Sequence, residues 1–314
     1  MFEKKREVYR GEEAIFVSNA GKCNLSDTLE CGQAFRYEQT VAEDGYVEYL
    51  TVIGDILLRV GQRQAGELIF YGLQDGELDK VIDYFALDMD FEMIRDDVIS
   101  RTDSEWLKDA AYRADGIFIL RQDPWEALFS FIVSQNNNIP RIRKIIRSVC
   151  SEYGRNLAKE RALAECPLKD KRHAPCDEIC RNCGICYSFP RAEDVVKNPE
   201  GLLPSHPGFR YKYLLNAAER VYSGETDLEA IAARHSYEAT LTELKKILGV
   251  GDKVASCVAL FGFSNLEAFP VDVWMKRAND VYFGGALDPS TLGEYAGVAQ
   301  QYIFHKIRNL EKNL

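Results

Sequence analysis

Hydrophobic residues in the N-terminal part of the chain follow the spacing of β-strands. Across residues 46–73, Val, Ile, Leu, Tyr and Phe alternate with polar residues or cluster between turns that contain glycine. This spacing is typical of an antiparallel sheet. From about Asp90 the hydrophobic residues recur with the period of amphipathic helices. The pattern therefore predicts a β-rich domain over residues 1–105 and a helical domain over residues 106–314.

Amphipathic segments continue through most of the second domain. In the segment 139–150 the hydrophobic stripe leaves four basic residues on the other side, which is usual for a solvated helix face. The expected helices cover residues 90–100, 105–114, 123–135, 139–150, 210–222, 237–248, 252–263, 271–283 and 291–310. The predicted fold class is α+β, with an N-terminal antiparallel β domain followed by a mostly helical domain.

The composition is that of a folded protein. The chain has 314 residues, of which 46% are hydrophobic, and it contains no low-complexity tract. No run approaches the roughly 18–20 apolar residues that span a bilayer, and the charged N-terminus has no hydrophobic secretion segment. We therefore expect a soluble, intracellular protein that has no membrane partner and is a monomer.

The net charge of −10 is the main argument against a nucleic-acid partner. Basic proteins gain affinity by neutralising phosphates, whereas an acidic chain is repelled by the duplex at long range. A local basic face can nevertheless coexist with an acidic remainder. The net charge alone therefore does not exclude a protein that binds DNA.

Nine cysteines are many for an intracellular protein, and five of them fall in an insert over residues 160–190. Without a secretion segment, clustered thiols favour metal binding or redox chemistry over a disulfide scaffold. Cys176, Cys180, Cys183 and Cys186 are separated by three, two and two residues, within reach of one tetrahedral ion. A structural zinc ion is the first interpretation, free thiols the second and an iron–sulfur cluster the third.

A glycine-containing hairpin is expected near residues 245–255. A helix that ends at Leu248 is followed by the turn LGVG and by a second helix that begins near Asp252. Gly249 and Gly251 let the backbone turn sharply and leave its amides uncovered. Amides at a helix N-terminus bind anions, so the hairpin can hold a DNA phosphate. An ordinary connection between two helices uses glycine in the same way.

A lysine at the end of this hairpin and an aspartate further along the chain form a candidate catalytic pair. Lys253 lies in the first turn of the second helix, where the macrodipole disfavours a cation and favours the neutral amine that can attack a carbon. Asp272 follows Pro270 and is placed to cap the next helix. Its carboxylate can stabilise an oxocarbenium-like transition state. The simpler interpretations are a solvated lysine and a purely structural N-cap.

The segments LGVGDKVASC and FPVDVWMK resemble the helix-hairpin-helix glycosylase superfamily, and within it the 8-oxoguanine DNA glycosylases. The resemblance covers most of the chain and implies a bifunctional enzyme of base-excision repair. Lys253 would attack the anomeric carbon with help from Asp272, and a Schiff base would then permit strand cleavage by β-elimination. The implied partner is double-stranded DNA containing 8-oxoguanine, and catalysis would need no cofactor. The implied location is the cytoplasm or nucleoid of a prokaryote, or the nucleus of a eukaryote.

Four positions would contact the lesion base if the resemblance holds. The carbonyl of Gly32, in CGQAFRY, would accept a hydrogen bond from N7–H, a proton that 8-oxoguanine has and guanine lacks. In YAGVAQQYIF, Gln300 would meet the Watson–Crick edge and Phe304 would stack on the base. Cys257 would lie against the opposite face of the base.

Four further positions would occupy the space around the orphan base. The segment SQNNNIPRI implies that Asn136 fills the vacated site and that Arg141 contacts the orphan cytosine. The segment HPGFRYKY implies that Phe209 is a wedge and that Arg210 is a second cytosine reader. Phe209 replaces a tyrosine of the family, and Trp274 stands where some members carry a histidine near a phosphate.

Three other functions are compatible with parts of the pattern. A related glycosylase for another oxidised or alkylated purine would share the hairpin and the aspartate, although alkylpurine enzymes often lack the lysine. A catalytically silent lesion-binding protein would not require both Lys253 and Asp272. A metal or redox sensor would have its functional centre in the cysteine-rich insert.

Overall fold

The computed structural model describes residues 2–161, 168 and 184–312. The N-terminal part forms one six-stranded antiparallel sheet, with strand order β1-β2-β6-β5-β4-β3. The strands are β1 (Glu3–Tyr9), β2 (Glu12–Ser18), β3 (Tyr37–Glu43), β4 (Tyr46–Ile53), β5 (Ile56–Gln62) and β6 (Leu68–Tyr71). The alternating hydrophobic pattern therefore forms the sheet that it predicts, and the α+β fold class is confirmed.

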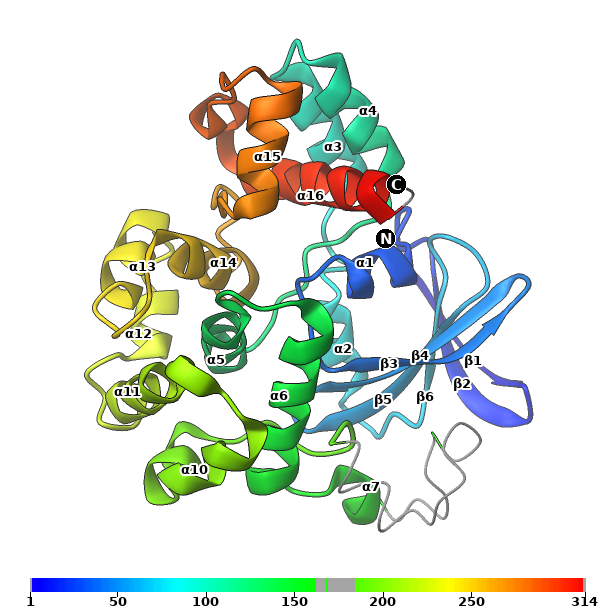
Figure 1. Cartoon of the computed structure of the whole chain (residues 1–314). Helices are drawn as coiled ribbons and strands as arrows, with labels where there is room; N and C mark the ends of the chain where they lie inside the picture. The colour runs from blue at the N-terminus through cyan, green and yellow to red at the C-terminus, as the bar shows by residue number, and fades with distance from the viewer. Residues whose placement is uncertain (1, 162–167, 169–183, 313–314) are drawn as a thin grey trace.

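Helices make up most of the remaining described chain, and they lie mainly to one side of the sheet and above it in Figure 1. In the order of the chain they are α1 (Leu25–Glu30), α2 (Leu78–Tyr84), α3 (Phe91–Ser100), α4 (Glu105–Arg113), α5 (Pro124–Ser134), α6 (Ile139–Tyr153), α7 (Leu157–Glu160), α10 (Ala192–Lys197), η1 (Pro199–Ser205), η2 (Gly208–Arg210), α11 (Tyr211–Tyr222), α12 (Leu228–Ala232), α13 (Tyr237–Leu244), α14 (Asp252–Gly262), α15 (Val273–Tyr282), η3 (Pro289–Tyr295) and α16 (Ala296–Lys312). Within the described ranges, none of these helices is long and apolar enough to cross a membrane.

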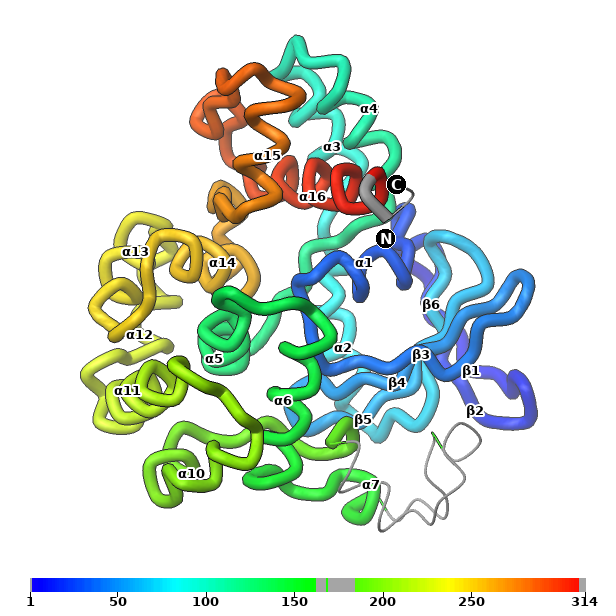
Figure 2. Tube along the Cα trace, viewed as in Figure 1, coloured from blue at the N-terminus to red at the C-terminus, as the bar shows by residue number. Residues whose placement is uncertain are grey.

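Segments from opposite ends of the chain share one helical group. Helices α3 and α4 pack against α16, and α15 packs against α16 as well. Figure 2 shows these early and late parts of the chain side by side, away from the group formed by α5, α6 and α10–α14. One hydrophobic core contains residues from the sheet and from both helical groups. Because this core spans both parts, the boundary between two domains at residue 105 stays a prediction from the sequence.

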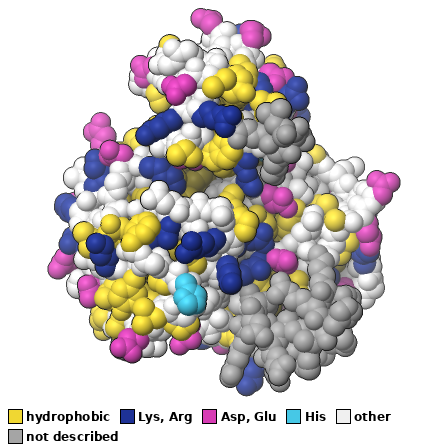
Figure 3. All heavy atoms as spheres, in the orientation of Figure 1, with side chains coloured by type: hydrophobic (Ala, Val, Ile, Leu, Met, Phe, Trp, Pro, Cys, Tyr) yellow, Lys and Arg dark blue, Asp and Glu magenta, His cyan; other side chains and the backbone are white. Residues whose placement is uncertain are grey.

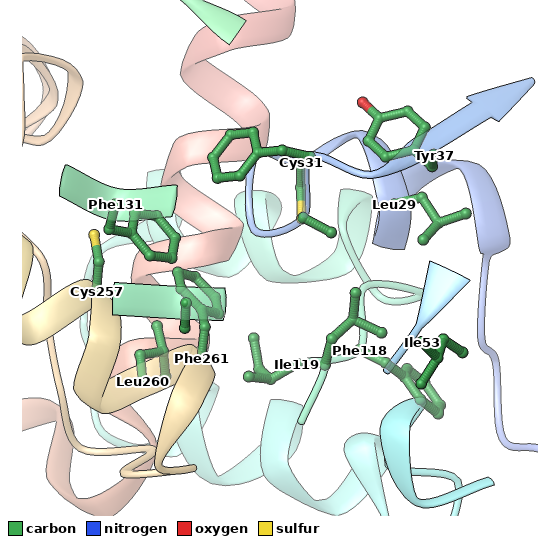
Figure 4. Close-up of a cluster of buried hydrophobic side chains, with 14 of the residues drawn as sticks. Leu29, Cys31, Tyr37, Ile53, Phe118, Ile119, Phe131, Cys257, Leu260 and Phe261 are labelled. Atoms are coloured by element: carbon green, nitrogen blue, oxygen red, sulfur yellow. The ribbon is translucent and has the colours of Figure 1, made fainter. Parts of the chain in front are cut away.

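Helix α5 is buried along almost its whole length and packs against α14. The rings of Phe131 and Phe261 stack with their centroids 5.3 Å apart, and Cys257 lies beside them (Figure 4). A Cβ atom on Gly262 would lie 3.0 Å from Ala127 and 3.1 Å from Pro124, so the end of α14 touches the start of α5. The two helices are therefore antiparallel, and the start of α14 lies near the end of α5.

A buried ion pair joins the segment before β3 to the start of α5. Arg36 Nη1 lies 2.7 Å from Glu126 Oε2, and the two side chains are 3% and 16% exposed. Arg36 Nη2 also donates to the carbonyl of Tyr187 at 2.5 Å. Burial raises the pKa of the Glu126 carboxyl, and the Arg36 guanidinium opposes that rise. One side chain thus connects three distant parts of the chain.

Replacing Arg36 with methionine should lower the free energy of unfolding by about 3–5 kcal/mol at neutral pH, because an unpaired carboxylate then stays buried. The folded-state pKa of Glu126 would rise further above its unfolded value. The loss should therefore be small below the unfolded pKa and grow as the pH rises through the folded pKa. Urea unfolding measured from below the unfolded pKa to above the folded pKa tests whether the loss of stability grows with pH. The double variant Arg36→Met/Glu126→Leu is the control and should recover most of the stability, whereas an equal loss at every pH would contradict the assignment.

Candidate active site

Lys253 lies at the start of α14 and is anchored to the end of α5. Its Nζ donates to Ser134 Oγ at 3.2 Å and lies 5.5 Å from the centre of the Phe131 ring. Ser134 in turn donates its hydroxyl proton to the carbonyl of Phe131 at 2.8 Å. The side chain of Lys253 is half-buried. The packing of α5 on α14 therefore holds the amine of Lys253 in a fixed, partly desolvated position.

Asp272 is the N-cap of α15, as its position after Pro270 predicts. Its Oδ1 accepts hydrogen bonds from the backbone amides of Trp274 at 3.0 Å and Met275 at 2.9 Å. Oδ2 accepts no hydrogen bond from any residue in the described ranges. The cap thus fixes the carboxylate through one oxygen and leaves the other available.

The thiol of Cys257 is influenced by the charges of both Lys253 and Asp272. Burial raises the pKa of Cys257. The positive charge of Lys253 and a hydrogen bond from it lower this pKa, while the negative charge of Asp272 raises it. The amine and the carboxylate, 19 residues apart in sequence, therefore both act on one buried sulfur. This arrangement suits nucleophilic attack by an amine at a centre that develops positive charge.

The structure brings Gly32 and Phe304 together. Gly32 follows α1 with a φ of +87°, a left-handed conformation that favours glycine. A Cβ atom here would lie 3.4 Å from Phe304 and 3.5 Å from Ile139. Arg308 connects the two elements, because it donates to the carbonyl of Glu30 at 2.9 Å and lies 5.9 Å from the Phe304 ring. The backbone of Gly32 is therefore held beside an aromatic ring of α16.

Gln300 lies one turn before Phe304 on α16 and is only 3% exposed. Its Oε1 accepts a hydrogen bond from Nε2 of Gln301 at 2.7 Å. Sequence reasoning singled out Gln300 and missed Gln301. The sequence feature that could have indicated Gln301 is the pair of adjacent glutamines among the hydrophobic residues of this helix.

Arg210 is buried, and its guanidinium holds the loop between α5 and α6. It donates to the carbonyls of Gln135 at 2.8 Å, Asn136 at 3.0 Å and Pro207 at 3.2 Å. Burial and the positive charge of Arg141 lower the pKa of Arg210. The two predicted cytosine readers are thus close, although Arg141 is exposed and Arg210 already binds backbone carbonyls.

Asn136 and Phe209 both project at the surface near this loop. Asn136 is exposed and has a φ of +45°, which the carbonyl bonds of Arg210 help to maintain. Phe209 is 49% exposed, and its ring contacts that of Tyr213 edge-on with centroids 6.0 Å apart. The Arg210 guanidinium lies 4.4 Å from the Phe209 ring. An exposed aromatic side chain and a residue with an exposed amide are therefore both in contact with one buried arginine.

The hairpin between α13 and α14 is tied to α11. Helix α13 ends at Leu244, four residues earlier than the sequence predicts, because the following amides of Lys246 and Ile247 bond three residues back in tight turns. The amide of Leu248 donates to Asn216 Oδ1 at 2.9 Å. Gly249 has a φ of +80°, and a Cβ atom there would lie 2.5 Å from the Tyr213 ring. Gly251 is the N-cap of α14 and is exposed.

Cations without an ion-pair partner in the described ranges occur on the elements that frame this site. They lie on α6, α11, α14 and α15, and they are Arg141, Lys144, Lys212, Lys253 and Lys276. Many other cations are neutralised, as in the pair Arg95–Asp115 at 2.5 Å. Figure 3 shows Lys and Arg side chains across the middle of one face and acidic residues mainly at its margins. The acidic net charge is therefore compatible with a local basic surface.

The predicted metal site is only partly within the described residues. Cys176, Cys180 and Cys183 lie outside them, and Cys186 is fully buried. In the part of the chain that the structure describes, no three His, Cys, Asp or Glu side chains are grouped to hold a metal ion. The zinc interpretation is thus untested by the geometry.

Several known proteins are similar to this chain in sequence or in structure. A family model described as the N-terminal domain of 8-oxoguanine DNA glycosylase matches residues 15–128. The N-glycosylase/DNA lyase of Saccharomyces cerevisiae is 30% identical over 285 residues, which cover 82% of this chain and 68% of the yeast protein.

Two solved structures superpose on almost the whole chain. The 8-oxoguanine glycosylase/lyase of Clostridium acetobutylicum, in complex with double-stranded DNA containing cytosine opposite 8-oxoguanine, is 30% identical with a TM-score of 0.78. It covers 100% of this chain and 99% of its own. MBOgg1 in complex with a low-affinity DNA ligand is 32% identical with a TM-score of 0.79. It covers 98% of this chain and 99% of its own.

The hairpin geometry predicts different responses at its two glycines. Gly249→Ala should lower the free energy of unfolding by about 1–3 kcal/mol, because alanine is strained at this positive φ and its Cβ atom would overlap the Tyr213 ring. Gly251→Ala is the matched control and should cost less than about 1 kcal/mol, since its φ is negative and its Cβ atom meets open space. Thermal unfolding of both variants measures the difference. Equal losses would show that the Tyr213 contact does not constrain the hairpin.

Proposed function

This chain belongs to the family of 8-oxoguanine DNA glycosylase/lyases, and we propose that it excises 8-oxoguanine from duplex DNA with Lys253 as nucleophile and Asp272 as the assisting carboxylate. One observation carries the assignment of these residues. Lys253 Nζ is anchored to Ser134 where α5 packs on α14, and Asp272 caps α15 through Oδ1 alone, so each group is held in place with its reactive part available. A catalytically silent lesion-binding protein would have no need to hold these two groups together.

The reaction begins with extrusion of the damaged nucleotide, because its anomeric carbon is inaccessible within the stacked duplex. The neutral amine of Lys253 attacks that carbon, and the glycosidic bond breaks as the base leaves with the bonding electrons. Oδ2 of Asp272 is available to stabilise the positive charge that develops on the sugar. The ring then opens to a protonated Schiff base. Loss of a proton from C2′ breaks the C3′–O bond, and the 3′ phosphate departs.

The lesion base would be read by Gly32, Cys257, Gln300 and Phe304. The mutual proximity of Gly32 and Phe304 supports a pocket in which the glycine carbonyl and the ring contact the same base. The deep burial of Gln300 supports its role at the Watson–Crick edge, since a polar side chain there is shielded from water. The hairpin amides at Gly249 and Gly251 would hold a phosphate.

The orphan cytosine would be held mainly by Arg141. Arg141 is exposed and has no ion-pair partner in the part of the chain described, so its donors are available. Arg210 could contribute only by exchanging one of its bonds to Gln135, Asn136 or Pro207. Phe209 and Asn136 would fill the gap that the extruded nucleotide leaves. The clostridial relative was solved with cytosine opposite 8-oxoguanine, which supports cytosine as the opposing base here.

The finer properties of the protein are proposals of the same kind. We propose that it acts as an intracellular monomer and that Cys176, Cys180, Cys183 and Cys186 hold one structural zinc ion. The spacing of the four cysteines supports the zinc site, which metal analysis of the purified protein tests. Catalysis would not require this ion, because the proposed chemistry uses only an amine and a carboxylate.

Lys253→Gln should abolish both base excision and covalent trapping by borohydride on a duplex containing 8-oxoguanine, because no amine remains to form the Schiff base. Binding to the lesion duplex should persist. Lys245→Gln is the matched control, since Lys245 is an exposed lysine of the same hairpin that pairs with Asp252 at 2.6 Å. A trapped adduct with the Lys253 variant, at a level like that of the control, would contradict the assignment of the nucleophile.

Excision should be faster opposite cytosine than opposite adenine, and Arg141→Ala should reduce that preference. A good contact to a base is worth about 1–3 kcal/mol, so the ratio of the two rates should fall by roughly 5- to 150-fold. Lys144→Ala is the control on the same helix, because an exposed lysine that contacts only phosphate weakens binding to both duplexes alike. Single-turnover rates measure both effects. Equal wild-type rates against all four opposing bases would show that Arg141 does not read the orphan base.

A further inference from the structure

The hydroxyl group of Ser134 makes two hydrogen bonds at the end of α5, one as a donor and one as an acceptor. It donates its proton to the carbonyl of Phe131 at 2.8 Å and accepts a proton from Nζ of Lys253 at 3.2 Å. A serine hydroxyl has one proton and two lone pairs, so the bond to Phe131 uses its whole capacity to donate. Ser134 therefore meets Lys253 only as an acceptor.

The bond to Phe131 belongs to the end of the helix. Ser134 is the last residue of α5, so the carbonyl of Phe131 is among the four that lack a partner within the helix. The amide of Gln135, which follows the helix, donates to the carbonyl of Ile132 at 3.4 Å. The Ser134 hydroxyl thus satisfies a carbonyl of its own helix, and this bond keeps its proton away from Lys253.

The bond from Lys253 limits how the amine can be oriented. A neutral amine has two N–H protons and one lone pair, and only the lone pair can attack a carbon. The acceptor oxygen of Ser134 binds a proton and cannot bind the lone pair. The Phe131 ring has its centre 5.5 Å from Nζ, and the negative face of an aromatic ring attracts protons as well. Both contacts with α5 therefore favour protons on the side of α5 and the lone pair elsewhere.

We propose that Ser134 is a positioning residue that holds an N–H of the Lys253 amine toward α5 and leaves the lone pair directed away from α5, into the active site. The inference rests on the proposed function, in which Lys253 is the nucleophile. A hydroxyl that donated to the amine would bind the lone pair and block the attack. The bond from Ser134 to Phe131 prevents this, so the end of α5 determines both where the nitrogen lies and in which direction it reacts.

Ser134→Ala should slow single-turnover excision of 8-oxoguanine by roughly three- to tenfold on the alkaline plateau of the rate, the worth of one hydrogen bond. Affinity for the lesion duplex should stay unchanged, because both bonds of Ser134 lie within the protein. Ser134→Thr keeps a hydroxyl that can make the same bond to its own helix and should restore most of the rate. Ser100→Ala is the matched control, since Ser100 ends α3 with the same kind of bond, to the carbonyl of Asp97 at 2.7 Å.

The pH profile separates positioning of the amine from a general disturbance of the helix end. An acceptor stabilises the protonated amine more than the neutral one, because hydrogen bonds from charged donors are stronger. Without the Ser134 oxygen the neutral amine forms at lower pH. The half-maximal rate of Ser134→Ala should therefore shift to lower pH, and its deficit relative to the wild type should shrink as the pH falls. A disturbed helix end would lower the rate by the same factor at every pH.

Borohydride trapping on a duplex with a preformed abasic site is the second readout, because Lys253 attacks the sugar there and no base has to be extruded or read. We expect the same pH-dependent deficit. If the wild type excises 8-oxoguanine while Ser134→Ala matches it at every pH, or falls below it by one constant factor, the positioning role is overturned and the proposed function stands. If the wild type neither excises 8-oxoguanine nor forms a trapped adduct, the proposed function itself fails.

Discussion

The contact between α5 and α14 is the constraint on which the site depends. Helix α5 is buried along most of its length, and α14 runs antiparallel to it with Gly262 against Pro124. Large apolar surfaces are lost from water on both helices, so sliding one past the other would expose core residues or force overlaps. Lys253 and Ser134 lie at the other end of this contact. The position of the Lys253 amine thus follows from the packing of these two helices in the core.

Irregular segments around the site are held by arginines. Arg210 binds carbonyls on both sides of the turn after α5, Arg308 binds the carbonyl before the turn that contains Gly32, and Arg36 joins the start of α5 to Tyr187. A guanidinium offers five donors in a rigid plane, so it can satisfy several backbone carbonyls that no helix or sheet would pair.

The sequence predicts those features that depend on local periodicity or on short motifs. The strand pattern over residues 46–73 and the helical stripes yielded the fold class, and the N-cap at Asp272 follows from its position after Pro270. Helices α1 and α2 were not predicted, because at 6 and 7 residues they are too short to show a period. The contacts of Ser134 and Gln301, and the burial of Arg210, depend on segments far apart in the chain. Periodicity contains no information about such contacts.

The uneven distribution of paired charges has a consequence for how the protein would search a genome. An intact duplex that meets few unpaired cations releases few counterions, so it is held weakly and its affinity changes little with ionic strength. Each visit to undamaged DNA is then short. Time is spent only where an extruded nucleotide adds contacts that the phosphates do not provide. An acidic enzyme with a narrow basic surface would thus make many brief encounters with undamaged DNA and stay only a short time at each.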